Sequence, residues 1–352
     1  MSKRILITPL DWGLGHATRC IPIIRELQNR GCQVFMASSG RAFDLLKLEF
    51  PALTCFELAG YNPFYPANGN MTFSMSTQVK KFMQTIAKEH EQVQKIVHYN
   101  KIDIIISDNR YGCYHTAIPS IFITHQLTIQ MPFWLKWVEP ILNFYNHQKI
   151  SNFTECWVPA PIQSFIPKLV KSNAKLKVRH IGYLSRFEKK TLPLSYAICV
   201  ICSGPEPQRT EFEKLLTKEL KTGKQTAILV RGKPETPTKQ FKNTDTLTIC
   251  NYLDSEELNI AIEQSEIIIS RPGYSTVMDL AKLQKKAIFI PTPGQTEQEY
   301  VADVLMKQQV ALSVKQSEFN LQTALINAKE LNGFSTFGND NSLLQKALDS
   351  IL

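Results

Sequence analysis

The sequence predicts an α/β protein of two Rossmann-like domains whose parallel sheets face one another across a cleft. The chain has 352 residues, which corresponds to two domains at roughly 150 residues each. Short β-rich segments alternate with longer segments of helical period, and this alternation is typical of βαβ units and a parallel sheet. Hydrophobic residues make up 43% and charged residues 20%, which suits a chain with large buried cores and excludes a disordered, collagen-like or coiled-coil protein.

The first half of the chain predicts one of these sheets. Isoleucine is nearly continuous from Ile102 to Ile106, as expected for a strand covered by helices on both faces. Between Val79 and Val97 apolar residues recur at spacings of three, four and seven, which predicts one long amphipathic helix. The expected strands are 4–8, 33–37, 53–58, 102–107, 120–124 and 156–158.

The alternation restarts after Leu194 and predicts the second sheet. The expected strands are 197–202, 226–230, 247–250, 267–270 and 287–290, and the expected helices are 208–220, 256–264, 275–283 and 298–307. The weakly patterned stretch before Leu194 is the expected linker. The domains are therefore expected at 1–181 and 195–335, with the linker at 182–194 and a C-terminal helix in 336–352 that packs back on the N-terminal domain.

The charge and the cysteines limit the function classes. A formal net charge of +9 suits an anionic partner such as nucleic acid, a nucleotide or an acidic membrane face. Nucleic-acid binding would not explain the glycine loops described below, so no nucleic-acid partner is expected. Cys199 and Cys202 form the only CxxC, but in a strand their side chains point to opposite faces, so buried thiols in a reducing compartment are favoured over a metal site.

The N-terminus and the hydropathy indicate a cytoplasmic protein. The apolar run Ile5–Ile7 is too short for a signal peptide. No stretch reaches the ~18 apolar residues that a membrane-spanning helix needs. A cytoplasmic location is therefore expected.

A glycine loop follows the first expected strand. Gly13 and Gly15 allow a ligand to approach the backbone, and the helix that follows offers unpaired N–H groups to an anion. Thr18 stands where a dinucleotide-binding loop has its third glycine, and no acidic residue clearly follows the second strand. A dinucleotide site is therefore disfavoured.

His16 is the candidate base at the start of that helix. The helix dipole disfavours the imidazolium, so a neutral ring able to accept a proton is expected, although His16 could instead only pack at the turn. Asp108 ends the isoleucine-rich strand, where it could orient His16, meet an acceptor hydroxyl or simply start a turn. His125 closes the next strand and is a similar candidate. The expected acceptor-side residues are Gly13, Gly15, Arg19 and His125.

The second domain has its own turn-to-helix junction. Gly273, Ser275 and Thr276 can donate hydrogen bonds to phosphate oxygens at a helix N-terminus. Asp279 could accept from both hydroxyls of a ribose. Gly204 lies in a small-residue turn that could border the same phosphates, and the loop 291–299, which ends with Gln298 and Glu299, has a composition suited to sugar hydroxyls.

An ordered set of motifs between residues 251 and 302 carries a family resemblance. The motifs are Tyr-Leu-Asp at 252–254, Ser-Arg-Pro-Gly at 270–273, Asp-Leu-Ala at 279–281, Pro291 and Glu-Gln-Glu-Tyr at 297–300. This segment resembles the nucleotide-binding domain of GT-B glycosyltransferases of family 28. It is similar to the bacterial enzymes that add N-acetylglucosamine from UDP-N-acetylglucosamine to the lipid-linked peptidoglycan precursor. Residues 13–19 match the N-terminal glycine loop of that family more loosely.

The resemblance implies roles for individual residues. The backbone at Leu253 would hold the base and Asp279 the ribose. Gly273 and Thr276 would flank the diphosphate, whereas Gln298 and Glu299 would meet the donor sugar. His16 would face the acceptor and serve as base. The sequence departs from the family pattern at three places: Glu299 stands in place of a second amide, Asp279 in place of a glutamate, and the turn 203–207 in place of a glycine-rich loop.

The implied reaction is an inverting transfer from a nucleotide diphosphate sugar, with UDP-sugar the expected donor, to a glycan or lipid-linked acceptor of the cell envelope. Arg231 or Arg271 would stabilise the departing diphosphate. No Asp-x-Asp pair suits a divalent ion, so neither a metal nor a cofactor is expected. A sugar-nucleotide epimerase and a non-catalytic sugar-nucleotide binder are the alternatives.

The stretch from Met131 to Tyr145 is unusually aromatic. One interpretation is that its side chains cover the first sheet, and this one is favoured because Pro140 interrupts any single amphipathic helix. The other is that Trp and Tyr beside Lys136 and Lys149 contact an anionic membrane that presents a lipid-linked acceptor. Peripheral contact with the inner membrane face is thus a hypothesis.

Overall fold

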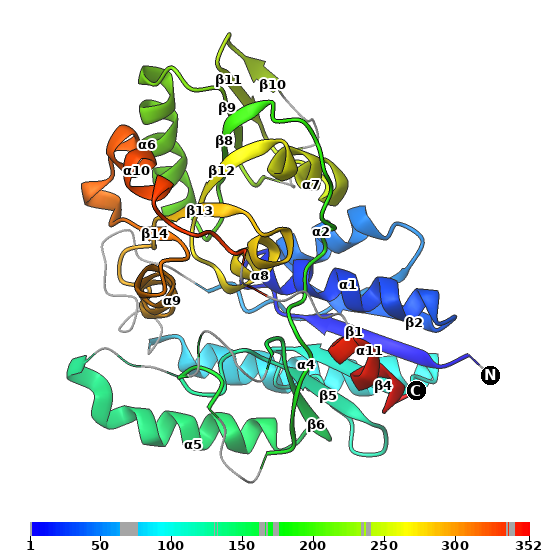
Figure 1. Cartoon of the computed structure of the whole chain (residues 1–352). Coiled ribbons are helices and arrows are strands. Elements are labelled where there is room, and N and C mark those ends of the chain that lie inside the picture. Colours follow the sequence, from blue (N-terminus) through cyan, green and yellow to red (C-terminus); the bar gives the residue numbers. More distant parts are fainter. Residues whose placement is uncertain are drawn as a thin grey trace. The chain divides into compact units, whose positions relative to one another are not determined.

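The computed structural model describes residues 2–63, 77–129, 131, 133–161, 166, 168–171, 176–233, 236, 241–335, 337 and 342–352. These residues divide into two compact units. Unit 1 contains described residues of 2–63, 77–184 and 342–352, and unit 2 contains those of 185–337. Each unit is an α/β domain with its own sheet (Figure 1).

The sheet of unit 1 has seven strands in the order β3-β2-β1-β4-β5-β6-β7, and every neighbouring pair is parallel. β1 and β4 are neighbours, and their register sets Pro9 opposite Asp108 at the carboxyl ends. The strands are β1 Arg4–Pro9, β2 Gln33–Ser38, β3 Thr54–Glu57, β4 Ile104–Asp108, β5 Ser120–Ile123, β6 Glu155–Val158 and β7 Val178–His180.

Helix α4 (Val79–Asn100) is the long helix that the apolar spacing predicts. Its second half packs Val93 and Val97 into one cluster with Leu6 of the sheet. The first turn of α4 is less buried than the predicted apolar stripe implies, since Val79 is 54% exposed. The other helices of unit 1 are α1 Gly15–Asn29, α2 Gly40–Glu49, the 3₁₀ helix η1 Phe133–Val138, α5 Glu139–Ile150 and α11 Ser342–Asp349.

The C-terminal helix α11 belongs to unit 1. Leu344, Ala347 and Leu348 form its buried side. Arg30 Nη1 binds Asp349 Oδ1 at 2.5 Å, which ties the end of α11 to the end of α1. The last helix is thus held by apolar burial and by an ion pair.

The sheet of unit 2 also has seven strands, in the order β10-β11-β9-β8-β12-β13-β14. Its pairs are parallel except that β10 runs antiparallel to β11. The strands are β8 Tyr196–Ile201, β9 Ala227–Val230, β10 Phe241–Asn243, β11 Leu247–Cys250, β12 Ser265–Ser270, β13 Lys286–Phe289 and β14 Leu312–Ser313.

Helices α6 and α10 bury apolar side chains on one face of this sheet, where Phe212, Leu216 and Leu321 join the side chains of β8 and β12 in a single core (Figure 1). Helix α7 begins with a capping box, in which Asp254 and Glu257 satisfy each other's backbone N–H groups. The helices of unit 2 are α6 Gln208–Thr222, α7 Ser255–Glu263, α8 Tyr274–Leu283, α9 Thr296–Lys307, the 3₁₀ helix η2 Gln316–Glu318 and α10 Leu321–Lys329.

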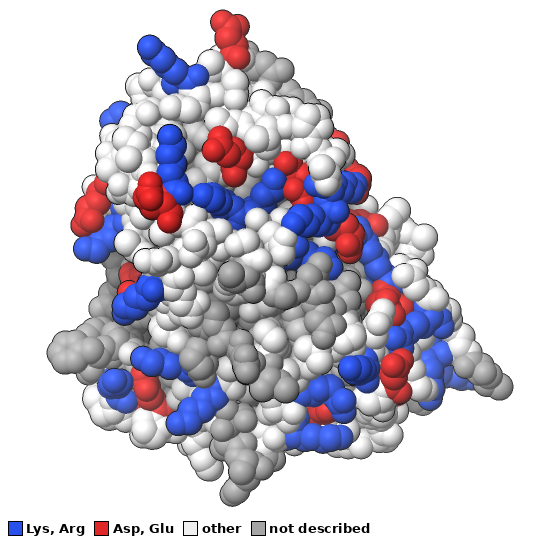
Figure 2. Space-filling view, in the orientation of Figure 1, with Lys and Arg blue, Asp and Glu red and all other residues white. Residues whose placement is uncertain are grey.

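The predicted fold class, two α/β domains with parallel sheets, is confirmed. The prediction of buried thiols is also confirmed for Cys199 and Cys202, which are free and buried, and burial raises the pKa of Cys202 to about 12. Among the helices the structure describes, none is both long and apolar enough to cross a bilayer. In the view of Figure 2, lysines and arginines are interspersed with acids rather than gathered into one basic patch.

Candidate functional site

The glycine loop places His16 at the carboxyl end of the unit 1 sheet. Gly13 has a φ of +96°, a left-handed value that glycine adopts readily, so the chain can turn sharply between β1 and α1. Helix α1 begins at Gly15, and His16 is its second residue. Because β1 and β4 are neighbours, this turn lies beside the end of β4. His16 Nδ1 is 2.7 Å from Asp108 Oδ1.

Arg19 completes this cluster by contacting Asp108 and two histidines. Its guanidinium donates two hydrogen bonds to the carboxylate of Asp108. Its Nη2 lies 2.9 Å from His16 Nδ1, and its Nη1 lies 2.9 Å from His125 Nδ1. The side chain of Arg19 is only 1% exposed, and His125 is also buried. The expectation that Arg19 and His125 bind an acceptor directly is therefore corrected: both are buried supports beneath His16.

The charges of this cluster favour a neutral histidine. Burial lowers the pKa of His16 below its usual value, and the charge of Arg19 lowers it further, against the opposing effect of Asp108. Burial alone would raise the pKa of Asp108, but the charge of Arg19 and the hydrogen bonds from Arg19 and His16 outweigh it and bring that pKa to about 2. Asp108 is fully buried, so of its expected roles the structure supports orienting His16 and not meeting an acceptor.

His16 is the partly accessible member of the cluster, with a side chain 16% exposed. Nδ1 lies between a carboxylate oxygen that accepts and a guanidinium that donates. When Nδ1 carries the proton and donates it to Asp108, Nε2 is left with a lone pair that can take a proton from a hydroxyl. The arrangement can therefore perform general-base chemistry.

Unit 2 supplies an anion-binding turn at the start of α8. Gly273 is the N-cap of this helix in an extended conformation. A Cβ at Gly273 would meet only Thr276 Oγ1, at 3.8 Å, so there is open space over this turn. Ser275 and Thr276 are partly exposed in the first turn. These features suit a phosphate group at a helix N-terminus.

Arg271 is not available to a diphosphate. Its guanidinium donates to the carbonyl oxygens of Ile290 and Pro291 at 2.8 and 2.9 Å and to Gln316 Oε1 at 2.6 Å. The residue is 1% exposed, and burial lowers its pKa to about 10. The expectation of a leaving-group contact is corrected, because Arg271 ties the β13–α9 loop to η2.

Arg231 is the more accessible of the two expected cations. Its side chain is 31% exposed, with Nε 2.7 Å from Glu213 Oε1 and Nη1 2.9 Å from Asn251 Oδ1. It lies just beyond β9. Gly204, which follows β8, has a φ of +107° and open space at its Cβ position. Arg231 and Gly204 are thus both compatible with a ligand at the carboxyl edge of the unit 2 sheet.

Asp279 also differs from expectation. It is 8% exposed, and its Oδ1 accepts a hydrogen bond from Ser185 Oγ at 2.6 Å. Burial raises the pKa of Asp279 to about 6, although the nearby charge of Arg186 opposes this rise. The expected ribose contact is therefore corrected: Asp279 holds the segment at Ser185, which lies in the predicted linker.

The remaining donor candidates are Gln298, Glu299 and Leu253. Gln298 is buried and accepts from the Thr292 backbone N–H at 2.8 Å. Glu299 accepts from the Gly294 N–H at 3.1 Å and lines an open cavity of about 970 Å³. Gln298 therefore shapes the loop, whereas Glu299 is open to a ligand. Leu253 lies just before the capped start of α7 and is partly exposed.

The aromatic segment is more exposed than the favoured interpretation predicts. Trp137 is 72% exposed, and three side chains that follow it on α5 are 53% to 66% exposed. We call these residues the α5 apolar face; they are Trp137, Ile141, Phe144 and Tyr145. Since they do not cover the sheet, the favoured interpretation is wrong for these four. Gln130, Pro132 and the side chains of Phe133 and Trp134 lie outside the described residues.

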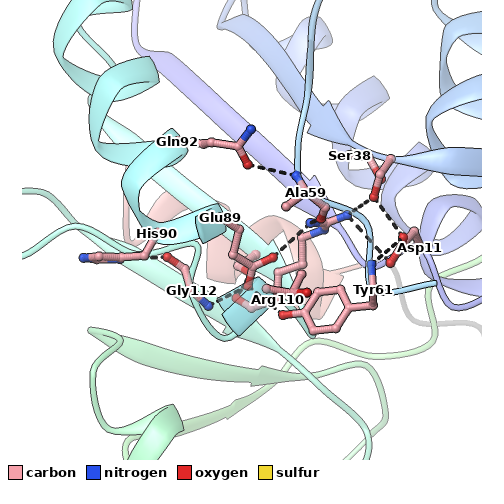
Figure 3. A network of polar contacts seen from close by, with 12 residues as sticks. Asp11, Ser38, Ala59, Tyr61, Glu89, His90, Gln92, Arg110 and Gly112 are labelled. Atoms are coloured by element: carbon pink, nitrogen blue, oxygen red, sulfur yellow. Dashed lines mark hydrogen bonds and ion pairs between the residues drawn. The ribbon is translucent and has the colours of Figure 1, made fainter. Parts of the chain in front are cut away.

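A second polar cluster, which the sequence analysis did not predict, lies at the carboxyl end of the unit 1 sheet. It joins Glu89 of α4 to Arg110, which follows β4, as shown in Figure 3. One signal could have revealed it: Glu89 falls in the gap between Ile86 and Val93 of the apolar stripe. An acid on a buried helix face requires a partner.

Within the described parts of the chain, no group of three metal-ligating side chains occurs. Comparison with protein families finds a match within each unit. Residues 210–333 match the Glycosyltransferase family 28 C-terminal domain, and residues 3–131 match Glycosyl transferase family 1. The chain is a glycosyltransferase.

Individual relatives agree with this assignment. An "Uncharacterized glycosyltransferase" of Methanosarcina acetivorans is 23% identical over 328 residues, which are 87% of this chain and 84% of the relative. A protein of Flavobacterium psychrophilum is 30% identical over 96 residues, 27% of this chain and 26% of the relative. Its name is UDP-N-acetylglucosamine--N-acetylmuramyl-(pentapeptide) pyrophosphoryl-undecaprenol N-acetylglucosamine transferase.

The fold of the glycosyltransferase is GT-B. The crystal structure of the glycotransferase of kitacinnamycin superposes with a TM-score of 0.65 at 14% identity, over 99% of this chain and 98% of that one. The expected resemblance to a family 28 nucleotide-binding domain is confirmed by the match over residues 210–333.

Proposed function

We propose that this glycosyltransferase moves a sugar, with inversion, from a UDP-sugar to a lipid-linked acceptor of the cell envelope, with His16 as the base. The observation that carries this proposal is the buried ion pair of Asp108 and Arg19 beneath a neutral His16. Such an arrangement fixes the ring and leaves one nitrogen for the acceptor. The name of the Flavobacterium relative supports a UDP-sugar donor and a polyprenyl pyrophosphate acceptor.

In the proposed reaction, His16 Nε2 takes the proton of an acceptor hydroxyl as its oxygen attacks the anomeric carbon from the face opposite the diphosphate. The bond between that carbon and the diphosphate oxygen breaks, and the diphosphate leaves with the electron pair. The N–H groups of the first turn of α8 and the guanidinium of Arg231 would stabilise the negative charge that develops.

The proposed donor contacts follow the exposed candidates. Gly273, Ser275 and Thr276 would bind the phosphates, the backbone at Leu253 the base, and Glu299 the sugar. No ribose contact is assigned to Asp279, which is 8% exposed and binds Ser185. The sugar contact of Glu299 differs from an amide contact because a carboxylate only accepts hydrogen bonds.

The test uses UDP-N-acetylglucosamine labelled in the sugar and an acceptor with a polyprenyl pyrophosphate. His16→Gln should lower kcat by about 10²- to 10⁴-fold, because the general base is lost. The matched control is His98→Gln, which changes an exposed histidine of α4 and should leave kcat unchanged. Thermal-shift screening with UDP-, GDP-, dTDP- and CDP-sugars identifies the donor.

Each contrary outcome has a distinct meaning. Isomerised UDP-sugar without an acceptor would indicate an epimerase. Stabilisation by UDP with no turnover of any acceptor would indicate a binder. Stabilisation by none of the four nucleotide-sugar classes would contradict the proposal as a whole.

We further propose that the α5 apolar face meets the inner surface of an anionic membrane. Trp137, Ile141 and Tyr145 follow one another at helical spacing, and Lys136 is exposed beside them. Vesicle flotation with phosphatidylglycerol should recover the native protein and recover much less of a Trp137→Ser/Ile141→Ser variant. Ile326→Ser, which removes an equally exposed apolar side chain from α10, is the control. Equal flotation of all three proteins would refute membrane contact by α5.

A further inference from the structure

A second buried charge network lies beside the His16 cluster in unit 1, at the centre of Figure 3. Its hub is Arg110, which is 0% exposed. The guanidinium donates from Nε to the Pro9 carbonyl at 2.9 Å, from Nη1 to Glu89 Oε2 at 2.9 Å and to the Ala59 carbonyl at 3.1 Å, and from Nη2 to Ser39 Oγ at 2.6 Å. One side chain thus joins the ends of β1, β2 and β3 to helix α4.

Two carboxylates surround this cation. Glu89 Oε1 accepts from the Tyr61 hydroxyl at 2.7 Å and from the Gly112 N–H at 2.8 Å. Asp11 Oδ1 lies 3.8 Å from Arg110 Nη2, and its side chain is 4% exposed. Asp11 Oδ2 accepts from Ser39 Oγ at 2.9 Å and from the Tyr61 N–H at 3.1 Å. Arg110 thus lies between these two carboxylates and the segments that follow β1, β2 and β3.

Ser39 bridges Arg110 and Asp11 by hydrogen bonds. It accepts from Arg110 and donates to Asp11. Ser39 is also the N-cap of α2, where a serine hydroxyl commonly binds the helix backbone, yet here it makes no cap hydrogen bond. The hydroxyl is used by the network in place of the helix.

The network and the His16 cluster meet at one turn. Asn109 has a left-handed φ of +56°. Asp108, which precedes it, binds His16, whereas Arg110, which follows it, reaches Asp11. On the other side, the Leu10 N–H donates to the Asp108 carbonyl at 2.9 Å, and Asp11 begins the loop that leads through Gly13 to α1. Two contacts thus fix the position of His16. Asp108 binds its ring, and Asp11 anchors the loop that precedes its helix.

We propose that Arg110 is a positioning residue for His16: through Ser39 and Asp11 it fixes the loop that starts α1, and so sets where His16 Nε2 meets the acceptor. This inference rests on the proposed function and deepens it. Well-packed apolar side chains of similar volume often give as much stability as a buried ion network. What this network adds is a defined geometry at the edge of the sheet where ligands bind. A displacement of about 1 Å at such a site can cost about 10²-fold in rate.

Two substitutions separate geometry from charge. Arg110→Lys keeps a positive charge beside Glu89 but cannot make the forked contacts to Pro9 and Ser39. Ser39→Ala removes only the hydroxyl that bridges Arg110 and Asp11, and it is the milder change if the lysine variant folds poorly. Both leave Asp108 and Arg19 in place, so the pH at which His16 titrates should stay unchanged. The controls are Arg179→Lys, which alters the Arg179–Glu155 pair of β6 and β7, and Ser120→Ala, which alters a buried serine at the start of β5.

Kinetics and hydrogen exchange test the proposal together. Arg110→Lys should lower kcat by about 10- to 100-fold and Ser39→Ala by less, with the donor KM and the acid limb of the pH–rate profile unchanged. Amide exchange of residues 10–18 should speed up in both variants and in neither control. Faster exchange with unchanged kcat would overturn the positioning role and leave the proposed function intact. Unchanged exchange would overturn the proposal even if no transferase activity were found, whereas absence of activity in the native protein would refute only the proposed function.

Discussion

Replacing Asp108 by asparagine should destabilise unit 1, because the carboxylate is the counter-ion of a buried guanidinium. The side chains of Arg19 and Asp108 are 1% and 0% exposed, so water cannot compensate the lost charge. The pKa of Asp108 is lowered from 3.8 to about 2. At 1.36 kcal/mol per pKa unit, this difference corresponds to about 2 kcal/mol of folding free energy near neutral pH.

The expected loss in the Asp108→Asn variant is larger than that figure. The neutral amide would leave the buried Arg19 cation without its counter-ion, and breaking a buried pair in this way costs about 3–5 kcal/mol. The sign of the pH dependence follows from the lowered pKa: the stabilisation is present above about pH 4 and is lost as the pH falls toward 2. The stability difference between native protein and variant should therefore shrink by roughly 1 kcal/mol between about pH 7 and pH 3.

Urea unfolding of both proteins at several pH values measures this difference. The matched control is Asp103→Asn at the other end of the same strand, where the carboxylate accepts from the Arg4 N–H at 2.7 Å. Among the described residues, no guanidinium forms an ion pair with Asp103, so its variant should lose at most about 1 kcal/mol. In the Asp108→Asn variant the pKa of His16 should fall further, because the carboxylate raises it, and the acid limb of the pH–rate profile should move to lower pH. A variant as stable as the native protein, with an unmoved acid limb, would show that the ion pair does neither of these things.

Three further substitutions test other parts of the structure. Asp279→Asn should stabilise the protein by up to about 3 kcal/mol above pH 6 and by little near pH 4. Burial raises the Asp279 pKa from 3.8 to about 6, so the folded native protein loses stability as the pH rises through that range. Thermal melts of both proteins at the two pH values test this. Arg271→Ala should cost about 3–5 kcal/mol in urea unfolding, since it leaves the carbonyls of Ile290 and Pro291 without their donor, and a loss below about 1 kcal/mol would contradict the tether. Gly13→Ala should lower stability by about 1–2 kcal/mol although nothing lies within 4 Å of the added methyl, because φ is +96°; an unchanged Tm would refute backbone strain as the reason for glycine there.

The regular elements of the fold were predictable because their apolar spacing is strong. The isoleucine run of β4 and the helical period of the apolar residues in α4 are patterns that loops do not show. The strands that escaped prediction are β7, β10 and β14, with three, three and two residues. Segments this short carry no period, and they pair only because a neighbouring strand is already in place.

The site was predictable in position but not in the direction of its charged side chains. The carboxyl ends of the strands correctly brought His16 and Asp108 together. The sequence could not tell that Arg19 and Arg271 point into the protein, because a guanidinium next to a strand end can meet solvent or carbonyl oxygens equally well. That choice depends on loops distant in the sequence, such as the carbonyl of Pro291, which binds Arg271.

Because the C-terminal helix α11 belongs to unit 1, that unit cannot be produced intact from the N-terminal half of the chain alone. A fragment that stops at Leu184 would contain every strand of the unit 1 sheet but not α11. The surface that Leu344, Ala347 and Leu348 cover would then be open to water, and Arg30 would lose Asp349. Isolating this half as a stable piece should therefore require grafting the C-terminal peptide onto it, or supplying that peptide in trans.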